Sequence, residues 1–276
     1  MSSPCLRPVA SLAAGHRDAP ATCGPAPLVR QSTWTPESLC ALAASDPAPA
    51  KVTHALRVQL HDTLWHSLSS EYDARHLSTF LRESALDLSG AFWSLESAWA
   101  EDEHRHYRAL RWLYSHVYSI DESQLDAQLQ QRQPNFDPLR PLLRDEFSLC
   151  VILAFDELAS ARSYARDRAR FRPLGTAAVR LFHWAARDEF LHCRNAVDLV
   201  RARHADRLAD VPTVLAQAIA HDTSPQRRYD ATFLLDQIPD SEENSLDEAF
   251  LRECADKVDR YLRAKESSYA ADQDIS

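Results

Sequence analysis

The chain has 276 residues, of which 45% are hydrophobic, and its formal net charge is −9 at pH 7. Four glycines are too few for the tight turns of a β-sandwich or barrel or for a glycine-rich phosphate loop, and the acidic balance gives no general reason to expect nucleic acid or an anionic membrane as partner. The scarcity of glycine makes an all-α fold the expectation. The six cysteines are dispersed and form no C-x-x-C pair, which rules out a zinc knuckle or a thioredoxin motif, so we expect free thiols.

The N-terminal segment differs in composition from the rest of the chain. Residues 1–50 are rich in Pro and Ala, show no sustained periodicity and contain few acids, so we expect a flexible segment with a short helix at about 36–44. Such a segment can mimic an organellar transit peptide, which makes import the alternative to a cytoplasmic location. Residues 267–276, rich in Ser, Asp and Ala, are expected to form a flexible tail.

Residues 51–266 carry the periodicity of a helical bundle. Four long helices and two shorter ones are predicted at about 52–83, 90–118, 140–170, 175–204, 211–221 and 246–265. Ser245 and Glu248 fit a capping box at the start of the last helix. The connection between the second and third long helices is too long for a bundle hairpin and predicts a crossover or a small extra helix. No stretch is apolar enough to predict a membrane span.

The second long helix contains the pattern Glu-x-x-His twice, within the stretch WAEDEHRH. Apolar residues that recur every three or four positions mark the buried face of a helix, and Glu103 and His106 fall on that face. Glu101 and His104 fall on the opposite face, where water solvates them. Burying a carboxylate beside an imidazole is costly without compensation. A metal cation would compensate for this burial, but for one such pair taken alone a satisfied polar contact in the core is the favoured interpretation.

The fourth long helix repeats this motif. Glu189 and His192 lie on its apolar face in FHWAARDEFLHC, and an aspartate precedes the glutamate in both copies. A carboxylate-bridged two-metal site takes one glutamate from each of two helices and Glu-x-x-His from each of two others. Glu71 lies 32 residues before Glu103, and Glu157 lies 32 residues before Glu189. The predicted ligands are Glu71, Glu103, His106, Glu157, Glu189 and His192.

The donor set indicates which metal it suits. Carboxylate oxygens with imidazoles favour iron or manganese over zinc, and four carboxylates balance the charge of two divalent ions. Asp102 and Asp188 are predicted to accept hydrogen bonds from the ligand histidines, more plausibly across the bundle than on their own helix, and the alternative for each is a surface charge. The rival acidic ligands on the first and third long helices are Asp73, Glu83, Glu146 and Asp156.

Three stretches near these residues are distinctive: WAEDEHRH followed by YRALRWL, then AFDELASA, then AARDEFLH. Over about residues 55–205 they resemble the soluble acyl-acyl-carrier-protein desaturases of the ferritin-like superfamily. The resemblance implies a ferritin-like four-helix bundle with extra C-terminal helices and a homodimer. It also implies two iron ions, O2, a ferredoxin-type electron donor and an acyl chain on acyl carrier protein. The match around Glu71 is confined to the glutamate, so substrate length and site of attack do not carry over.

The resemblance places Ser160 where the family has a threonine hydroxyl near the oxygen-binding side of the cluster. Ser160 is thus a candidate proton relay, and its alternative role is a helix serine bonded to its own backbone. The arginines of residues 162–172, with Arg201 and Arg203, are a candidate docking face for an acidic carrier protein. A solvated charged face is the alternative for this segment.

Other functions stay open at this point. One is a di-iron hydroxylase or N-oxygenase of a natural-product intermediate, although the arylamine oxygenases of the superfamily have a third histidine where this chain has Ala185. Another is a non-enzymatic ferritin-like iron-binding protein. A rubrerythrin-like peroxidase would need an iron-thiolate module that these cysteines do not provide.

Overall fold

The computed structural model describes residues 28–45, 52–224, 233–237 and 247–264, and every regular element in these ranges is helical. The predicted all-α class is thereby confirmed. The α-helices are α1 (Pro36–Ser45), α2 (His54–Glu83), α3 (Gly90–Tyr118), α4 (Glu122–Leu129), α5 (Glu146–Asp167), α6 (Thr176–Arg203), α7 (Val211–Asp222) and α8 (Glu248–Arg263). Short 3₁₀ turns lie at Asp137–Leu139, Arg172–Leu174 and Ala205–Asp210.

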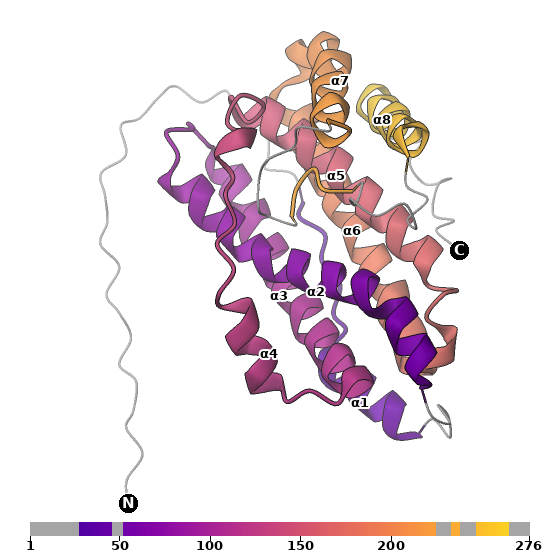
Figure 1. The fold of residues 1–276 in the computed structure, drawn as a ribbon. Helices are drawn as coiled ribbons and strands as arrows, with labels where there is room; N and C mark the ends of the chain where they lie inside the picture. The colour runs from indigo at the N-terminus through magenta and orange to yellow at the C-terminus, as the bar shows by residue number, and fades with distance from the viewer. Residues whose placement is uncertain (1–27, 46–51, 225–232, 238–246, 265–276) are drawn as a thin grey trace, which may run out of the picture.

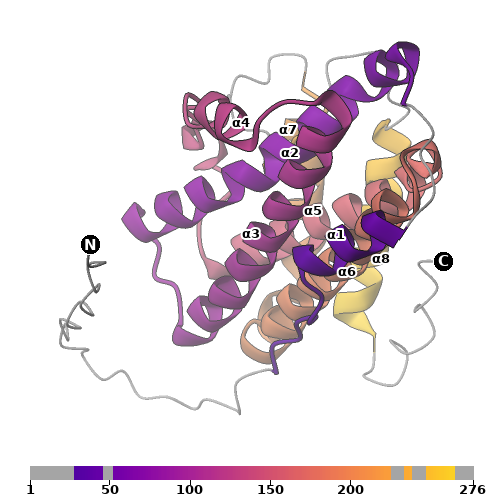
Figure 2. The ribbon, with the colours of Figure 1, turned by 90° about the horizontal axis from the view of Figure 1, so that it is seen from below.

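Helices α2, α3, α5 and α6 lie side by side as a bundle (Figures 1 and 2). The most extensive packing joins α2 to α3 and α5 to α6, so the bundle consists of two helical hairpins. The long connection between the hairpins contains the extra helix α4, which contacts α3, while α7 and α8 pack against α5 (Figure 1). None of the described helices has the length and hydropathy of a membrane span.

Side-chain caps explain where the long helices begin. Thr53 and Ser89 accept hydrogen bonds from the third backbone N–H beyond them, at the starts of α2 and α3. Helix α5 begins at residue 146 rather than near 140, because Asp145 and Ser148 form a reciprocal capping box. At α8 the capping residue is Asp247, which accepts from the N–H of Phe250. Ser245, expected in that role, lies outside the described residues.

The apolar core is divided into two clusters along the bundle axis. One cluster joins the C-terminal part of α2 and the N-terminal part of α3 to α5, α7 and α8. The other joins the N-terminal part of α2 and the C-terminal part of α3 to the N-terminal part of α6. The polar residues described below lie at the middle of the four long helices, between these two clusters.

Part of the N-terminal segment packs on the bundle, in contrast to the flexibility expected for most of residues 1–50. Helix α1 contacts α3 and α6, and Leu39 is fully buried there. The short helix expected at 36–44 accounts for α1, but the apolar anchor was too short a pattern to predict the packing. Residues 1–27 and the tail at 267–276 lie outside the described part. The four described cysteines are free thiols: Cys40, Cys150, Cys193 and Cys254.

Candidate metal centre

The structure brings all six predicted ligand side chains together in the interior of the bundle. Each of α2 and α5 supplies one glutamate, and each of α3 and α6 supplies one Glu-x-x-His pair. The six side chains form two groups of four, and within each group one donor atom per residue lies within 4.8 Å of all the others. Glu103 and Glu189 belong to both groups. All six residues are buried, and this donor set could hold metal.

The donor atoms are spaced as the ligands of an ion are. His106 Nδ1 lies 3.1 Å from Glu189 Oε1 and 3.4 Å from Glu71 Oε2. His192 Nδ1 lies 3.0 Å from Glu189 Oε2 and 3.1 Å from Glu103 Oε1. Around an ion with bonds of about 2.1 Å, neighbouring ligand atoms are separated by about 3.0–3.4 Å. The spacing therefore leaves room for a cation between the donor atoms.

Several of these buried atoms have no hydrogen-bond partner among the described residues. Glu71 Oε2, Glu103 Oε1 and His106 Nδ1 are all inaccessible to solvent and make no hydrogen bond of acceptable geometry. Leaving a buried acceptor or charge unsatisfied is strongly unfavourable. Their lone pairs converge on a shared space, which is the arrangement that a metal ion satisfies. The residues present thus fit a metal centre of oxygen and nitrogen ligands.

The pKa shifts of the clustered side chains also favour a bound cation. Burial raises the pKa of Glu103 and of Glu157 well above the usual carboxyl range, and the nearby charge of Glu189 raises both further. Burial alone would lower the pKa of His106, but the carboxylates of Glu71 and Glu189 outweigh it and raise that pKa well above its usual range. Without metal the cluster therefore retains protons, and a cation would take their place.

Each histidine of the cluster is oriented by an aspartate from the other hairpin. His106 Nε2 lies 3.1 Å from Asp188 Oδ2, and His192 Nε2 lies 3.2 Å from Asp102 Oδ2. An Nε2–H that donates to the aspartate leaves Nδ1 as a lone-pair donor toward the cluster. The aspartates therefore act across the bundle, as the sequence interpretation favoured.

Residues of the N-terminal segment complete the surroundings of the centre, and local sequence patterns gave no signal for them. Trp34 donates from Nε1 to Asp188 Oδ2 at 2.6 Å, and its ring stacks on His106 with centroids 5.9 Å apart. Gln31 donates to Asp102 Oδ1 at 2.9 Å. Arg105 contacts both aspartates, at 2.6 Å from Asp102 and 3.7 Å from Asp188. Trp34 and Gln31, from the N-terminal segment, thus cover one side of the cluster, and the positive charge of Arg105, from α3, offsets the charges of the two aspartates.

The rival acidic residues have other partners or point elsewhere. Asp73 forms a two-pronged ion pair with Arg132. Asp156 accepts from the backbone N–H of Leu235 at 2.8 Å. Glu146 accepts from the backbone N–H of Ser89 and from Arg203, and Glu83 is exposed. Glu101 and His104, the outward pair of the doubled motif, are exposed as predicted.

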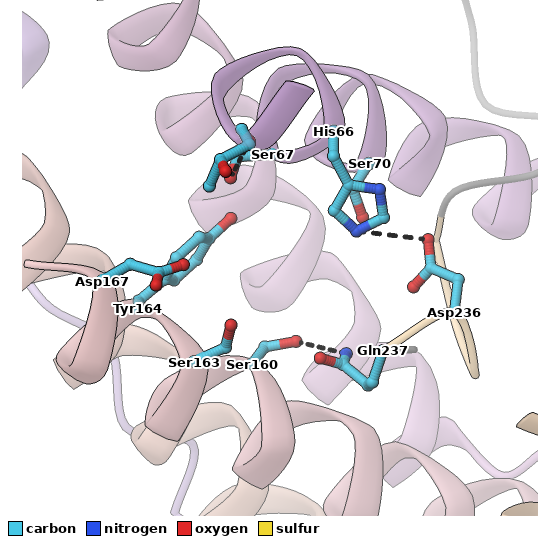
Figure 3. Close-up of a pocket in the computed structure, with 10 residues that line it drawn as sticks. His66, Ser67, Ser70, Ser160, Ser163, Tyr164, Asp167, Asp236 and Gln237 are labelled. Atoms are coloured by element: carbon cyan, nitrogen blue, oxygen red, sulfur yellow. Dashed lines mark hydrogen bonds and ion pairs between the residues drawn. The ribbon is translucent and has the colours of Figure 1, made fainter. Parts of the chain in front are cut away.

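Ser160, three residues after Glu157 on α5, lies in a polar pocket between α2 and α5. Figure 3 shows this pocket and the residues that line it. The Ser160 hydroxyl accepts a hydrogen bond from Gln237 Nε2 at 3.0 Å, and His66 and Asp236 face each other across the same pocket. The pocket volume is about 50 Å³, enough for a few waters. Tyr164 forms part of its wall, and the hydroxyl of Tyr164 donates to Glu71 Oε1. One side chain thus separates this pocket from a ligand of the cluster.

The arginines near the end of α5 already have contacts within the chain. Arg162 pairs with Glu253 of α8 at 2.7 Å, and Arg170 donates to the backbone carbonyl of Gln59.

No protein-family model, curated protein sequence or solved structure matches this chain. The functional argument therefore depends on the geometry of the site and on the motifs in its sequence.

Proposed function

We propose that the protein is an O2-dependent oxidoreductase with two iron ions held by Glu71, Glu103, His106, Glu157, Glu189 and His192. The observation that carries this proposal is the overlap of the two four-residue groups, which share Glu103 and Glu189. A carboxylate has two oxygens, so one glutamate can contribute to two ion sites. Apart from the two shared glutamates, each group contains one further glutamate and one histidine. Manganese is the alternative metal for this donor set.

The chain's own residues would prepare the site for this chemistry. Bound iron would supply O2 activation and the removal of hydrogen from an unactivated C–H bond. Asp102 and Asp188 hold the two imidazoles in one tautomer and orientation. Trp34 covers His106 and limits the access of water from that side. Tyr164 holds a proton beside Glu71, where burial raises the pKa of its hydroxyl well above the usual range.

The substrate class follows from the resemblance to acyl-acyl-carrier-protein desaturases. We propose an acyl chain as substrate, presented on acyl carrier protein, with electrons from a ferredoxin-type donor. In such a desaturation, adjacent CH2 groups lose two hydrogens to form a double bond. O2 takes these hydrogens with two further electrons and two protons, and leaves as two waters. Hydroxylation of the same chain would instead insert one oxygen atom.

The test begins with metal content. The full chain is reconstituted anaerobically with Fe²⁺, and bound iron is counted for the wild type, for Glu103→Ala and for Glu101→Ala. About two irons per chain are expected in the wild type and in Glu101→Ala, whose glutamate is exposed, with loss in Glu103→Ala. Iron binding that is unchanged by Glu103→Ala would refute the assignment of the cluster.

Substrate turnover then separates the remaining functions. The loaded protein is reduced, exposed to O2 and incubated with acyl-carrier-protein substrates and with free acids, and the products are analysed by mass. A product lighter by two hydrogens supports the desaturase, whereas a gain of one oxygen would replace it with a hydroxylase. Oxidation of iron in bulk without consumption of any organic substrate would identify an iron-binding protein instead.

A further inference from the structure

A second cavity, distinct from the polar pocket of Figure 3, opens between α2 and α3. This α2–α3 groove has a volume of about 220 Å³, and Glu71 and Glu103 are among the residues that line it. Both are members of the metal cluster, so the groove connects the cluster with the surface of the molecule. Clefts of this kind that end at a metal site are the places where small ligands bind.

An arginine that forms no ion pair within the described chain lies on the rim of the groove. Arg75, on α2 one turn beyond Glu71, is exposed, and no ion pair joins it to a carboxylate of the described chain. Its guanidinium is held over the ring of Tyr72, 3.5 Å from the centroid. A guanidinium fixed in this way offers a planar pair of donors to a carboxylate. Arg82 on the same helix and Arg111 on α3, by contrast, pair with acidic side chains.

An unsatisfied acceptor lies toward the other end of the groove. Glu96 is 2% exposed, and its Oε2 accepts from Arg82 at 2.7 Å. Its Oε1 is buried and has no hydrogen-bond partner among the described residues. Glu96 and Arg82 both line the groove. A ligand that reaches this end with an N–H or O–H group would satisfy the acceptor.

The two features define the chemistry of a ligand. The distance between Arg75 and Glu96 follows from Arg82, which is hydrogen-bonded to Glu96. Arg82 lies seven residues beyond Arg75 on α2, or about 10 Å along the helix axis. We infer that the α2–α3 groove binds a free, medium-length organic acid, with its carboxylate on Arg75 and a hydrogen-bond donor at its far end on Glu96.

The polarity of this arrangement also orients the acid. Because Arg75 follows Glu71 by one turn, the carbons next to the carboxylate lie nearest the cluster. The inference rests on the proposed function for the reaction, and it adds a free acid, whose carboxylate Arg75 can bind, as a second form of substrate beside the carrier-bound acyl chain. Binding of the acid itself does not depend on the reaction.

The test measures binding of defined probes by calorimetry. The full chain, metal-free and loaded with Mn²⁺, is titrated with 8-aminooctanoate, with octanoate and with octylamine. In the wild type, 8-aminooctanoate is expected to bind at least tenfold more tightly than either probe that lacks one of its end groups. Arg75→Gln should weaken both acids at least tenfold. Glu96→Gln should reduce the affinity for 8-aminooctanoate to that for octanoate, while octanoate itself is unaffected.

Arg140→Gln provides the matched control. Arg140 also lies over an aromatic ring, 4.6 Å from the centroid of Phe80, and it is exposed, but it does not line the groove. Its replacement should leave the affinity for all three probes unchanged. An equal loss in both arginine variants, unchanged binding in Arg75→Gln, or no binding of either acid to the wild type would overturn the inference. Arg75-dependent binding to protein that takes up no metal would retain the groove site while refuting the oxidoreductase.

Discussion

Replacing Asp188 by asparagine tests whether the aspartates set the orientation of the ligand histidines. Asp188 Oδ2 is the acceptor for both His106 Nε2, at 3.1 Å, and Trp34 Nε1, at 2.6 Å. An amide of the same shape has one acceptor oxygen and no charge, so Asp188→Asn weakens both bonds at once. Loss of the carboxylate partner of a metal-bound histidine typically costs 10–100-fold in metal affinity, or about 1.4–2.7 kcal/mol. A loss of the same size is expected from Asp102→Asn, because His192 Nε2 lies 3.2 Å from Asp102 Oδ2.

The affinity can be measured by titration with Mn²⁺, with the free ion followed by electron paramagnetic resonance. Asp198→Asn is the matched control, because Asp198 is also on α6 but pairs with Arg30 outside the cluster. Its metal affinity should equal that of the wild type. Affinities of Asp188→Asn and Asp102→Asn within about twofold of the wild type would show that the histidines do not need these carboxylates, and the argument for metal binding through Nδ1 would fail.

Three further predictions concern stability. Mn²⁺ at a hundred times its dissociation constant should raise the free energy of unfolding by about 2.7 kcal/mol for each ion bound, as measured by urea denaturation. A chelator or Glu103→Ala should abolish the gain, and equal stabilisation of Glu103→Ala would contradict the site. Burial alone would raise the pKa of Asp145, but hydrogen bonds from Ser148 and Arg207 lower it to about 2. The ionised carboxylate of Asp145 therefore stabilises the fold above its usual pKa of 3.8, and this stabilisation is lost as the pH falls toward 2. Asp145→Ala should therefore cost about 1 kcal/mol at neutral pH and less in acid, and a gap that does not narrow between pH values of about 6 and 3 would contradict this. Phe171→Ala should cost about 3–5 kcal/mol, because this ring is fully buried and stacks on Phe182, whereas Val58→Ala, at an exposed position, should change the stability by less than about 0.5 kcal/mol in the same denaturation.

Helical periodicity was sufficient to predict the four long helices and the side of each that faces inward. Glu103 and Glu101 are two residues apart, so they differ by about 200° around the helix, and the structure buries the first and exposes the second. The other two glutamates, Glu71 and Glu157, were predicted from their equal spacing before the two Glu-x-x-His motifs. Each of these inferences uses information within one helix or one hairpin.

The surroundings of the cluster could not be predicted in the same way. Trp34 precedes Asp188 by 154 residues, and nothing in the sequence near Trp34 indicates which helix it will cover. The predicted start of α5 near residue 140 is also too early, since the apolar residues 142 and 143 continue the pattern but lie before the cap at Asp145. Side-chain partners and helix ends depend on tertiary contacts, which periodicity does not contain.

The division of the apolar core into two clusters has a consequence for how the molecule unfolds. Between the clusters, the four long helices meet at the six ionisable side chains of the candidate metal centre, so without metal we expect each half of the core to lose its packing with less effect on the other. Two ions bound there, one in each group, would together tie residues 71, 103, 157 and 189 to one another and close three long loops of chain, much as a cross-link does. Metal should therefore convert a broad, stepwise denaturation into a single steep transition, with a larger dependence on denaturant concentration as well as a higher midpoint.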